Sequence, residues 1–533
     1  MQALLESFGY NSWVLPALLA IPLVGALVLW AHGATVGRGL PAERQMSAAR
    51  NIALPFFLVL FVVSLGLWWS LDVSDPGMQA RVDLPWISDW GVGFRVGVDG
   101  MAAMMVLLTT FIMPLAVLGS WTSVRTKPHA YYALMLVLTT GMLGVFVARD
   151  LFLFYAMWEV MLVPMYFIIG IWGGARRLYA SIKFFIYTFV GSLLMLVAIL
   201  YLGSAAGGAA GFDFSYDAVL DRARYGGTAA LWLFGAFFAA FAVKVPMFPF
   251  HTWLPDAHVE APTAGSVVLA AIMLKLGTFG FLRFALPFFP TAVTTPWVQN
   301  TILALAVVGI IYGALVAMVQ PDFKKLVAYS SVSHLGFVML GIFALTVESV
   351  QGALMVMINH GISTGALFLL IGMIYERKHT RMIDAYGGIA RVVPVFAALL
   401  TFVSLSSIGL PGTNGFVGEF LVLLGAFRTH PVLATVATTG VIFAAAYLLW
   451  AIQRILFNPL DKKENEHISD LNARELLLLA PLVVCIVWLG VYPAPVLRRM
   501  EASATRVVTL VETRAAEARA AAAAPTVGMS EGR

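Results

Sequence analysis

The stretch FAVKVPMFPFHTWLPDAH at residues 241–258 places Lys244 two residues before Pro246, at the end of an apolar run. The chain has 533 residues, of which 60% are hydrophobic and only 11% are charged, and its mean hydropathy is +0.88. Soluble domains carry about 25% charged residues, so this composition predicts an integral membrane protein. The lysine and the proline therefore lie in a helix that faces lipid, where a charge and a missing backbone donor are both costly.

The number of spans follows from the length of the apolar runs. A helix that crosses a bilayer needs about 20 apolar residues. Counting runs of that length between polar or Pro/Gly-rich breaks predicts an all-α polytopic membrane protein with about fourteen transmembrane helices. Their centres fall near residues 22, 60, 112, 138, 160, 192, 240, 274, 308, 335, 362, 410, 444 and 484.

The basic residues predict the orientation of these spans. Most of the 33 Lys and Arg lie in loops that follow odd-numbered spans, which the positive-inside rule assigns to the cytoplasm. The N-terminal segment contains Glu6 but no Lys or Arg, so it lacks the basic region of a cleaved signal peptide. With fourteen spans, both termini are predicted on the periplasmic side. The net charge of +5 is explained by these loops, and we predict no nucleic-acid partner.

A small set of ionisable residues lies within the predicted spans rather than in the loops. The set consists of Glu159, Lys244, Lys275, His334, His360 and Glu419. A charge at the centre of a membrane helix costs roughly 2.5–3.5 kcal/mol, so such groups are candidates for ion or proton transfer. The structural alternatives are a lysine stem that reaches the interface, a protonated carboxyl bound to a neighbour, and a neutral imidazole bonded to a carbonyl. Both lysines lie too far from a helix end for the first of these.

Two of the predicted spans contain helix breakers. Pro246 interrupts the seventh span, and Pro411 with Gly412 interrupts the twelfth. Unpaired backbone at membrane depth is tolerated only where protein or a polar cavity surrounds it. Two interrupted spans five helices apart are typical of inverted-repeat transporters, whose sites lie at mid-membrane. We therefore predict inverted five-helix repeats over spans 4–8 and 9–13, although ordinary kinked helices are the alternative.

These spans divide the chain into five parts. They are the N-terminal helices 1–3 (residues 1–125), the first repeat (126–290), the second repeat (291–460), a cytoplasmic loop with helix 14 (461–500) and a C-terminal tail (501–533). Residues 512–533 of this tail are rich in alanine and charge, which predicts a frayed helix followed by disorder.

Three segments resemble known membrane proteins. They are FHTWLPDAHVEAPTAGSVVLAAIMLKLGTFGFLRF (250–284), PDFKKLVAYSSVSHLGFVMLG (321–341) and GLPGTNGFVGEFLVLLGAF (409–427). They are similar to the antiporter-like subunits, subunit M in particular, of bacterial NADH-quinone oxidoreductase, the respiratory complex I. The similarity covers roughly residues 85–460, and subunits of Mrp-type Na⁺/H⁺ antiporters share the HTWLPDA core.

The resemblance implies a path for protons through the chain. It implies that Glu159 pairs with Lys244 on the broken seventh helix, that Lys275 follows on the eighth, and that the path ends at Glu419 on the broken twelfth. Glutamate at the last position is typical of subunit M, whereas the sister subunits and the Mrp antiporters usually carry lysine. It also implies sister antiporter-like subunits on either side of the chain in the bacterial inner membrane. FMN, iron–sulfur clusters and quinone are then expected on other subunits.

The residues themselves are suited to this role. Burial disfavours the charged forms of lysine and glutamate, and a nearby opposite charge restores them, so Glu159 and Lys244 can act as a switch. His334 and His360 titrate nearest neutrality and could bridge the distance to Glu419. We therefore expect proton translocation coupled to quinone reduction elsewhere in an NADH-quinone oxidoreductase, with no redox centre in this chain. The alternatives are a subunit of a Mrp-type antiporter or membrane-bound hydrogenase, and an unrelated solute transporter that binds its substrate near Lys244.

No metal or cofactor site is predicted in the chain. The only cysteine, Cys485, lies in an apolar run, which excludes a disulfide or Cys-based metal framework. The segment 251–262 contains two histidines and two carboxylates, but they lack a fixed ligand spacing. Its prolines favour a re-entrant connection.

Overall fold

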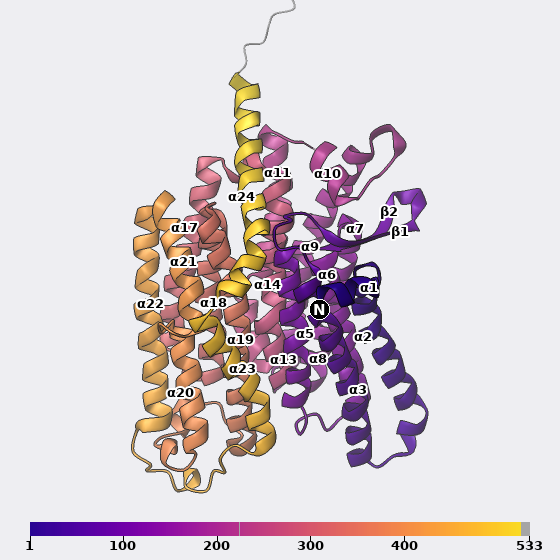
Figure 1. Ribbon diagram of the computed structural model, residues 1–533. Helices are drawn as coiled ribbons and strands as arrows, with labels where there is room; N and C mark the ends of the chain where they lie inside the picture. Colours follow the sequence, from indigo (N-terminus) through magenta and orange to yellow (C-terminus); the bar gives the residue numbers. More distant parts are fainter. Residues whose placement is uncertain (223, 524–533) are drawn as a thin grey trace, which may run out of the picture.

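The computed structural model describes residues 1–222 and 224–523 as a bundle of roughly parallel helices (Figure 1). In the described chain, thirteen helical segments are long and apolar enough to cross a membrane. They match the predicted spans except the twelfth, which consists of two shorter helices. The polytopic helical fold is therefore confirmed, and a count of fourteen depends on taking these two helices as one interrupted span.

The N-terminal part packs against one side of the bundle. Its helices are α1 (Gln2–Ser7), α2 (Tyr10–Ala34), α3 (Ala42–Leu65), α4 (Leu67–Ser70) and α5 (Gly100–Gly119). The face of α2 that is turned away from the bundle exposes large apolar side chains, Leu27 and Trp30 among them. Such a face is suited to lipid or to the apolar surface of another membrane subunit.

The next helices belong to the predicted first repeat. They are α6 (Pro128–Val147), α7 (Leu151–Val160), α8 (Leu162–Trp172), α9 (Arg177–Gly207), α10 (Tyr216–Arg222), α11 (Gly227–Lys244), α12 (Trp253–Glu260), α13 (Thr263–Val268), α14 (Leu274–Gly280) and α15 (Leu286–Phe288). Helices α7 and α8 form the fifth span, and α13 to α15 form the eighth. Within the eighth span, π-helical turns cover Leu269–Met273 and Phe281–Ala285.

The remaining helices form the predicted second repeat and the C-terminal part. They are α16 (Pro290–Val293), α17 (Pro296–Met318), α18 (Phe323–Phe343), α19 (Val347–Lys378), α20 (Pro394–Ile408), α21 (Asn414–Thr429), α22 (Pro431–Ile452), α23 (Ala473–Val491) and α24 (Ala494–Ala523). The spans formed by α13–α15 and by α19 are the most completely buried, so they lie at the centre of the bundle.

Both predicted helix breaks are present. Helix α11 ends at Lys244, and the non-helical segment that follows contains Pro246. Helix α20 ends at Ile408, and α21 begins at Asn414, beyond Pro411 and Gly412. Proline supplies no backbone donor and clashes with the preceding turn, which explains why neither helix continues.

Two corners of the fold repeat each other. Asp150 caps α7 and Asp322 caps α18, and each side chain accepts two backbone N–H groups of its own helix. Each cap residue also forms an isolated antiparallel bridge to the loop before a broken span, Asp150 to Ser215 and Asp322 to Met382. Because the two caps are five spans apart, they lie at opposite ends of the bundle. This match is the arrangement that an inverted repeat of spans 4–8 and 9–13 would produce.

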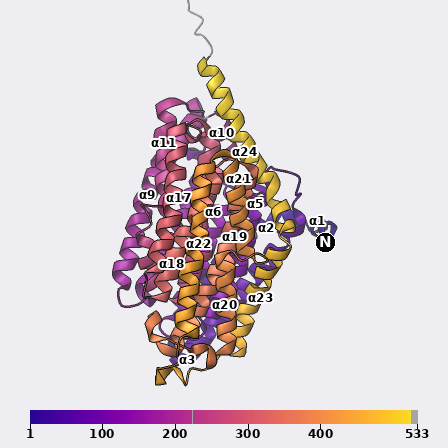
Figure 2. The ribbon, with the colours of Figure 1, turned by 90° about the vertical axis from the view of Figure 1, so that its left-hand side faces the viewer.

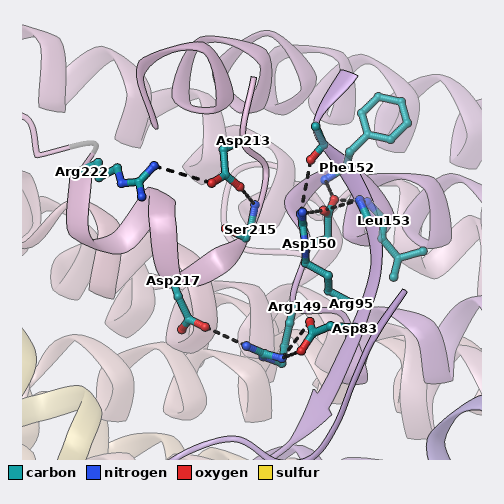
Figure 3. Close-up of polar contacts among 12 residues, drawn as sticks. Asp83, Arg95, Arg149, Asp150, Phe152, Leu153, Asp213, Ser215, Asp217 and Arg222 are labelled. Carbon is teal, nitrogen blue, oxygen red and sulfur yellow. Dashed lines mark hydrogen bonds and ion pairs between the residues drawn. The ribbon is translucent and has the colours of Figure 1, made fainter. Parts of the chain in front are cut away.

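A β-hairpin was not anticipated by the all-α prediction. Strand β1 (Gln79–Ile87) pairs antiparallel with β2 (Val92–Val98) between α4 and α5. Charged residues attach the hairpin to the corner at Arg149 and Asp150, and Arg149 connects this corner to α10 through Asp217, as Figure 3 shows. The ion pairs of this network are Arg95–Asp150 (2.6 Å), Arg149–Asp83 (3.2 Å), Arg149–Asp217 (2.7 Å) and Arg222–Asp213 (3.8 Å).

The helix predicted in the C-terminal tail is, in the described residues, the end of a longer helix. Helix α24 begins at Ala494, before the predicted boundary at residue 501, and runs along the side of the bundle (Figure 2). It packs there because apolar residues recur at helical spacing and are buried against α5 and α19. These residues are Val496, Met500, Ala504, Val507, Val508, Val511 and Ala515. The predicted disorder at 524–533 lies outside the described residues.

Candidate functional site

The site in the second half of the chain is centred on an acid–imidazole pair. Glu419 lies in the second turn of α21, and its Oε1 is hydrogen-bonded to Nδ1 of His334 on α18 at 2.8 Å. Both side chains are buried. The break before α21 lets the carboxylate reach this position, because Gly409 has φ +87° and leaves open the space beside Glu419 Oε2. A Cβ at Gly409 would lie 3.3 Å from that oxygen.

A second buried pair joins the eighth span to the eleventh. The Nζ of Lys275 lies 2.7 Å from Nδ1 of His360 on α19, and it also donates to the carbonyl of Ala270. That carbonyl belongs to the π-helical turn Leu269–Met273, just before Lys275. π-turns inside membrane and soluble helices often mark functional positions because they free backbone groups. A protonated Lys275 that donates to Nδ1 places the imidazole proton of His360 on Nε2.

The two pairs meet at a small cavity. The rings of His334 and His360 are 5.6 Å apart in an edge-to-face arrangement. The cavity beside them has a volume of about 20 Å³, which is sufficient for about one water molecule. It is lined by His334, Val356, Asn359, His360, Ser363, Thr364, Ser406, Ser407, Gly415 and Glu419. The structure thus connects Lys275, His360, His334 and Glu419 in one buried polar line.

Polar side chains stabilise the break in the twelfth span. Asn359 donates its amide to the carbonyl of Asn414 at 2.5 Å, and the side-chain oxygen of Asn414 accepts from Ser406 at 2.5 Å. Ser363 also reaches that oxygen, at 3.1 Å. These bonds satisfy groups that an interrupted helix leaves open, which membrane proteins require at this depth.

Glu159 and Lys244 occupy the first half of the chain, but they do not form an ion pair in this structure. Neither Lys244 Nζ nor Glu159 Oε1 has a hydrogen-bond partner among the described residues. The ammonium of Lys244 instead lies 5.5 Å from the ring centres of both Trp158 and Phe184. Aromatic faces attract a cation, but they do not replace hydrogen bonds. The predicted pairing of these two residues therefore stays a prediction.

The connection between the seventh and eighth spans contains the HTWLPDAH motif. The structure forms α12 from it, and Pro262 follows before α13 begins, so it connects two spans as a short helix. His258 in α12 is fully buried, stacks on Phe368 at 4.8 Å, and has no hydrogen-bond partner for either ring nitrogen in the described chain.

Several residues of the site were missed by sequence reasoning. They are Asn359, Ser363, Ser406, Ser407 and Asn414. Ser363 lies one turn after His360 on α19, so its polar side chain in a buried helix was a usable signal. The serines of α20 carried no such signal, because single serines are common in membrane helices.

The groups that line this arrangement are suited to proton transfer. Lysine, imidazole and carboxylate groups within hydrogen-bonding distance can exchange protons without covalent rearrangement. Broken helices that place ionisable groups at mid-membrane define a class, namely ion-translocating membrane proteins of the antiporter type.

Comparison with known proteins places the chain within this class. The chain belongs to the family described as NADH:quinone oxidoreductase/Mrp antiporter, TM, which matches residues 148–444. It is 48% identical over 482 residues to NADH-quinone oxidoreductase subunit M of Rhodobacter capsulatus, covering 89% of this chain and 92% of that protein. It is 41% identical over 500 residues to subunit M of Pseudomonas aeruginosa, covering 91% and 95% of the two chains.

Solved structures agree with this assignment. A chain of respiratory complex I from Thermus thermophilus with bound NADH is 33% identical and superposes with a TM-score of 0.83, covering 93% of this chain and 99% of that one. The Mrp complex from Dietzia superposes with a TM-score of 0.77 at 22% identity, covering 97% of this chain and 58% of that one. The second likeness supports the fold alone.

Proposed function

We propose that the chain is a proton-translocating membrane subunit of an NADH-quinone oxidoreductase and that the buried polar line carries the protons. The observation that supports the path best is the succession of contacts from Lys275 through His360 and His334 to Glu419. The relatives that are named subunit M support the choice of complex.

Proton transfer along this line needs no large movement. Lys275 passes a proton to His360 Nδ1, and His360 releases one from Nε2 into the adjacent cavity. A water molecule in the cavity would carry it to His334, whose Nδ1 faces Glu419. Each imidazole takes a proton on one nitrogen and gives one up from the other, so charge and protons balance at every step.

Glu159 and Lys244 act in this proposal as the switch that feeds the line. The unpaired arrangement corresponds to the open state of the switch. When the Glu159 carboxylate turns towards Lys244, it holds the ammonium in its charged form, and when it turns away the burial of Lys244 favours release of the proton towards Lys275. A rearrangement of side chains near the break in the seventh span would connect the two states.

The wider assignment follows from the family. We place the redox cofactors, FMN and the iron–sulfur clusters, and the quinone site on other subunits, and we place sister antiporter-like subunits on either side of this chain. The chain would lie in the bacterial inner membrane with both termini on the periplasmic side. A cation/proton antiporter subunit is the second candidate, because the family also includes Mrp antiporters. Na⁺ exchange by the chain alone would favour it.

The Glu159–Lys244 switch is tested by Glu159→Gln, Lys244→Ala and the double variant. The amide is uncharged and of similar size, so folding should survive. Proton uptake driven by NADH should fall strongly in each single variant, and quinone reduction should fall with it only as far as the two are tightly coupled. The double variant should be no worse than the worse single variant, because the two residues act as one unit.

The measurement compares proton uptake and quinone reduction in membrane vesicles that contain the fully assembled complex. Near-normal uptake in both single variants would remove the pair from the mechanism. Multiplicative losses would mean that the two residues act separately.

A further inference from the structure

A large pocket lies at the end of the bundle that carries the basic loops, away from the proton path. Its volume is about 640 Å³. It is bounded by the loop after α5, the connection between α8 and α9, the segment between α12 and α13, the start of α18 and the end of α19. The proton line uses none of the charged residues that line it.

The charges of this pocket are predominantly positive. Arg125, Arg177, Lys324 and Arg381 line it together with His379, and only Glu260 and Glu376 oppose them. Both carboxylates are already engaged: Glu260 accepts the backbone N–H of Arg176 at 2.8 Å, and Glu376 accepts the hydroxyl of Thr122 at 3.0 Å. Neither bond neutralises its carboxylate, and Arg381 pairs with Asp322 at 3.2 Å, so four cations face three carboxylates and the pocket keeps a small excess of positive charge.

The cations occupy two levels. Lys324 lies buried at the floor, where it donates to the carbonyl of Ala261 at 2.6 Å. Arg125 and Arg177 are exposed at the rim, and their guanidinium groups have no ion pair or side-chain hydrogen bond in the described chain. Two free guanidinium groups beside one pocket suit a phosphate, which they can bind through paired hydrogen bonds.

The surroundings of the pocket are those of a lipid interface. Ile171 and Tyr375 line the pocket and are 37% and 40% exposed, and Trp172 lies beside them. Tryptophan and tyrosine concentrate at the level of lipid headgroups. Basic pockets between spans at the positively charged side of a membrane protein bind anionic headgroups.

We propose that this pocket binds the phosphate of an anionic phospholipid headgroup between Arg125 and Arg177. Acyl chains would extend along Ile171 towards the bilayer. Free phosphate shares the same chemistry, but it would gain nothing from the apolar wall at Ile171 and Tyr375.

The test uses a photoactivatable phosphatidylglycerol added to the purified assembled complex, with labelled peptides mapped by mass spectrometry. Label is expected on peptides that contain residues 122–126 and 171–177. In the Arg125→Gln/Arg177→Gln double variant, half-saturation of that label should require about 30-fold more lipid, from roughly a fivefold effect of each cation. The matched control Lys127→Gln/Arg176→Gln removes two charges from the same loops but outside the pocket, and it should leave half-saturation unchanged.

Four results would overturn the proposal. The first is an absence of label at these peptides, the second is equal labelling by phosphatidylcholine, and the third is an equal effect of the two double variants. The fourth is displacement of the label by inorganic phosphate at the concentration at which unlabelled phosphatidylglycerol displaces it, which would identify a site for phosphate ions rather than lipid.

Discussion

The two buried lysines have different surroundings. Lys275 has partners for its ammonium in His360 and the carbonyl of Ala270, whereas Lys244 has only the faces of aromatic rings. A buried cation without hydrogen bonds lowers the stability of the fold, whereas the hydrogen bonds of a paired cation offset the cost of its burial. We therefore propose that Lys244 is retained for function and that Lys275, besides its proposed function, stabilises the fold.

This contrast predicts opposite effects of replacing each lysine by methionine, which has a similar length and no charge. Lys244→Met should leave stability unchanged or raise it, because it removes a buried charge without hydrogen bonds. Lys275→Met should lower stability by about 1–3 kcal/mol, because His360 Nδ1 and the Ala270 carbonyl lose their donor. Unfolding by SDS in mixed micelles measures both, and an equal loss in the two variants would contradict the assignment.

At this scale, the sequence indicated the candidate residues but not which of them lie in contact. Lys244, Lys275, His334, His360 and Glu419 could be selected because each is an ionisable group within an apolar run. Their order in space could not be read from the chain, since contacts such as Lys275 with His360 join residues 85 positions apart. The state of the Glu159–Lys244 switch depends on side-chain rotation, which no sequence pattern reports.

At the scale of the elements, the backbone conformation at the break between α20 and α21 determines the space beside the Glu419 carboxylate. Gly409 and Gly412 both have positive φ angles, +87° and +89°, so both positions favour glycine. Only Gly409 lies beside the Glu419 carboxylate, since a Cβ at Gly412 would meet nothing within 4 Å. Substitutions at these two glycines can therefore distinguish backbone strain from a change in the position of the Glu419 carboxylate.

Gly409→Ala and Gly412→Ala should therefore differ in function more than in stability. Each should lose about 1–2 kcal/mol, because an L-residue is strained in the left-handed region. Only Gly409→Ala should lower NADH-driven proton uptake, because its methyl group displaces Glu419 from His334. Both variants are tested by SDS unfolding and by proton uptake in vesicles. Equal losses of uptake in the two variants would show that the effect comes from backbone strain and not from contact with Glu419.

The elements were predicted where composition signals them. Prolines and glycines indicated the breaks after Lys244 and before Asn414, because their effect on a helix is local. The β-hairpin and the π-turns could not be predicted in this way, since they depend on long-range packing. The apolar residues of α24 recur at helical spacing in the sequence. The alanines and charges around them make this spacing hard to recognise.

In the whole molecule, the two halves have the same construction but different chemistry. Each has an Asp-capped span that carries an ionisable group, Glu159 in one and His334 in the other, facing a broken span that carries its counterpart. In the first half the broken span supplies a lysine, and in the second a glutamate. Glu419 and His334 are in contact at 2.8 Å, whereas Lys244 Nζ and Glu159 Oε1 have no hydrogen-bond partner in the described chain; in the proposed mechanism this corresponds to an assembled line and an open switch.

The central claim is that protons cross the molecule through His360, the residue that joins Lys275 to the cavity and His334. The most direct test is His360→Gln in the assembled complex, with NADH-driven proton uptake and quinone reduction measured side by side in membrane vesicles. Glutamine keeps a polar side chain but cannot take up a proton, so uptake should fall several-fold although the complex assembles normally. Uptake at the wild-type level in this variant would contradict the account.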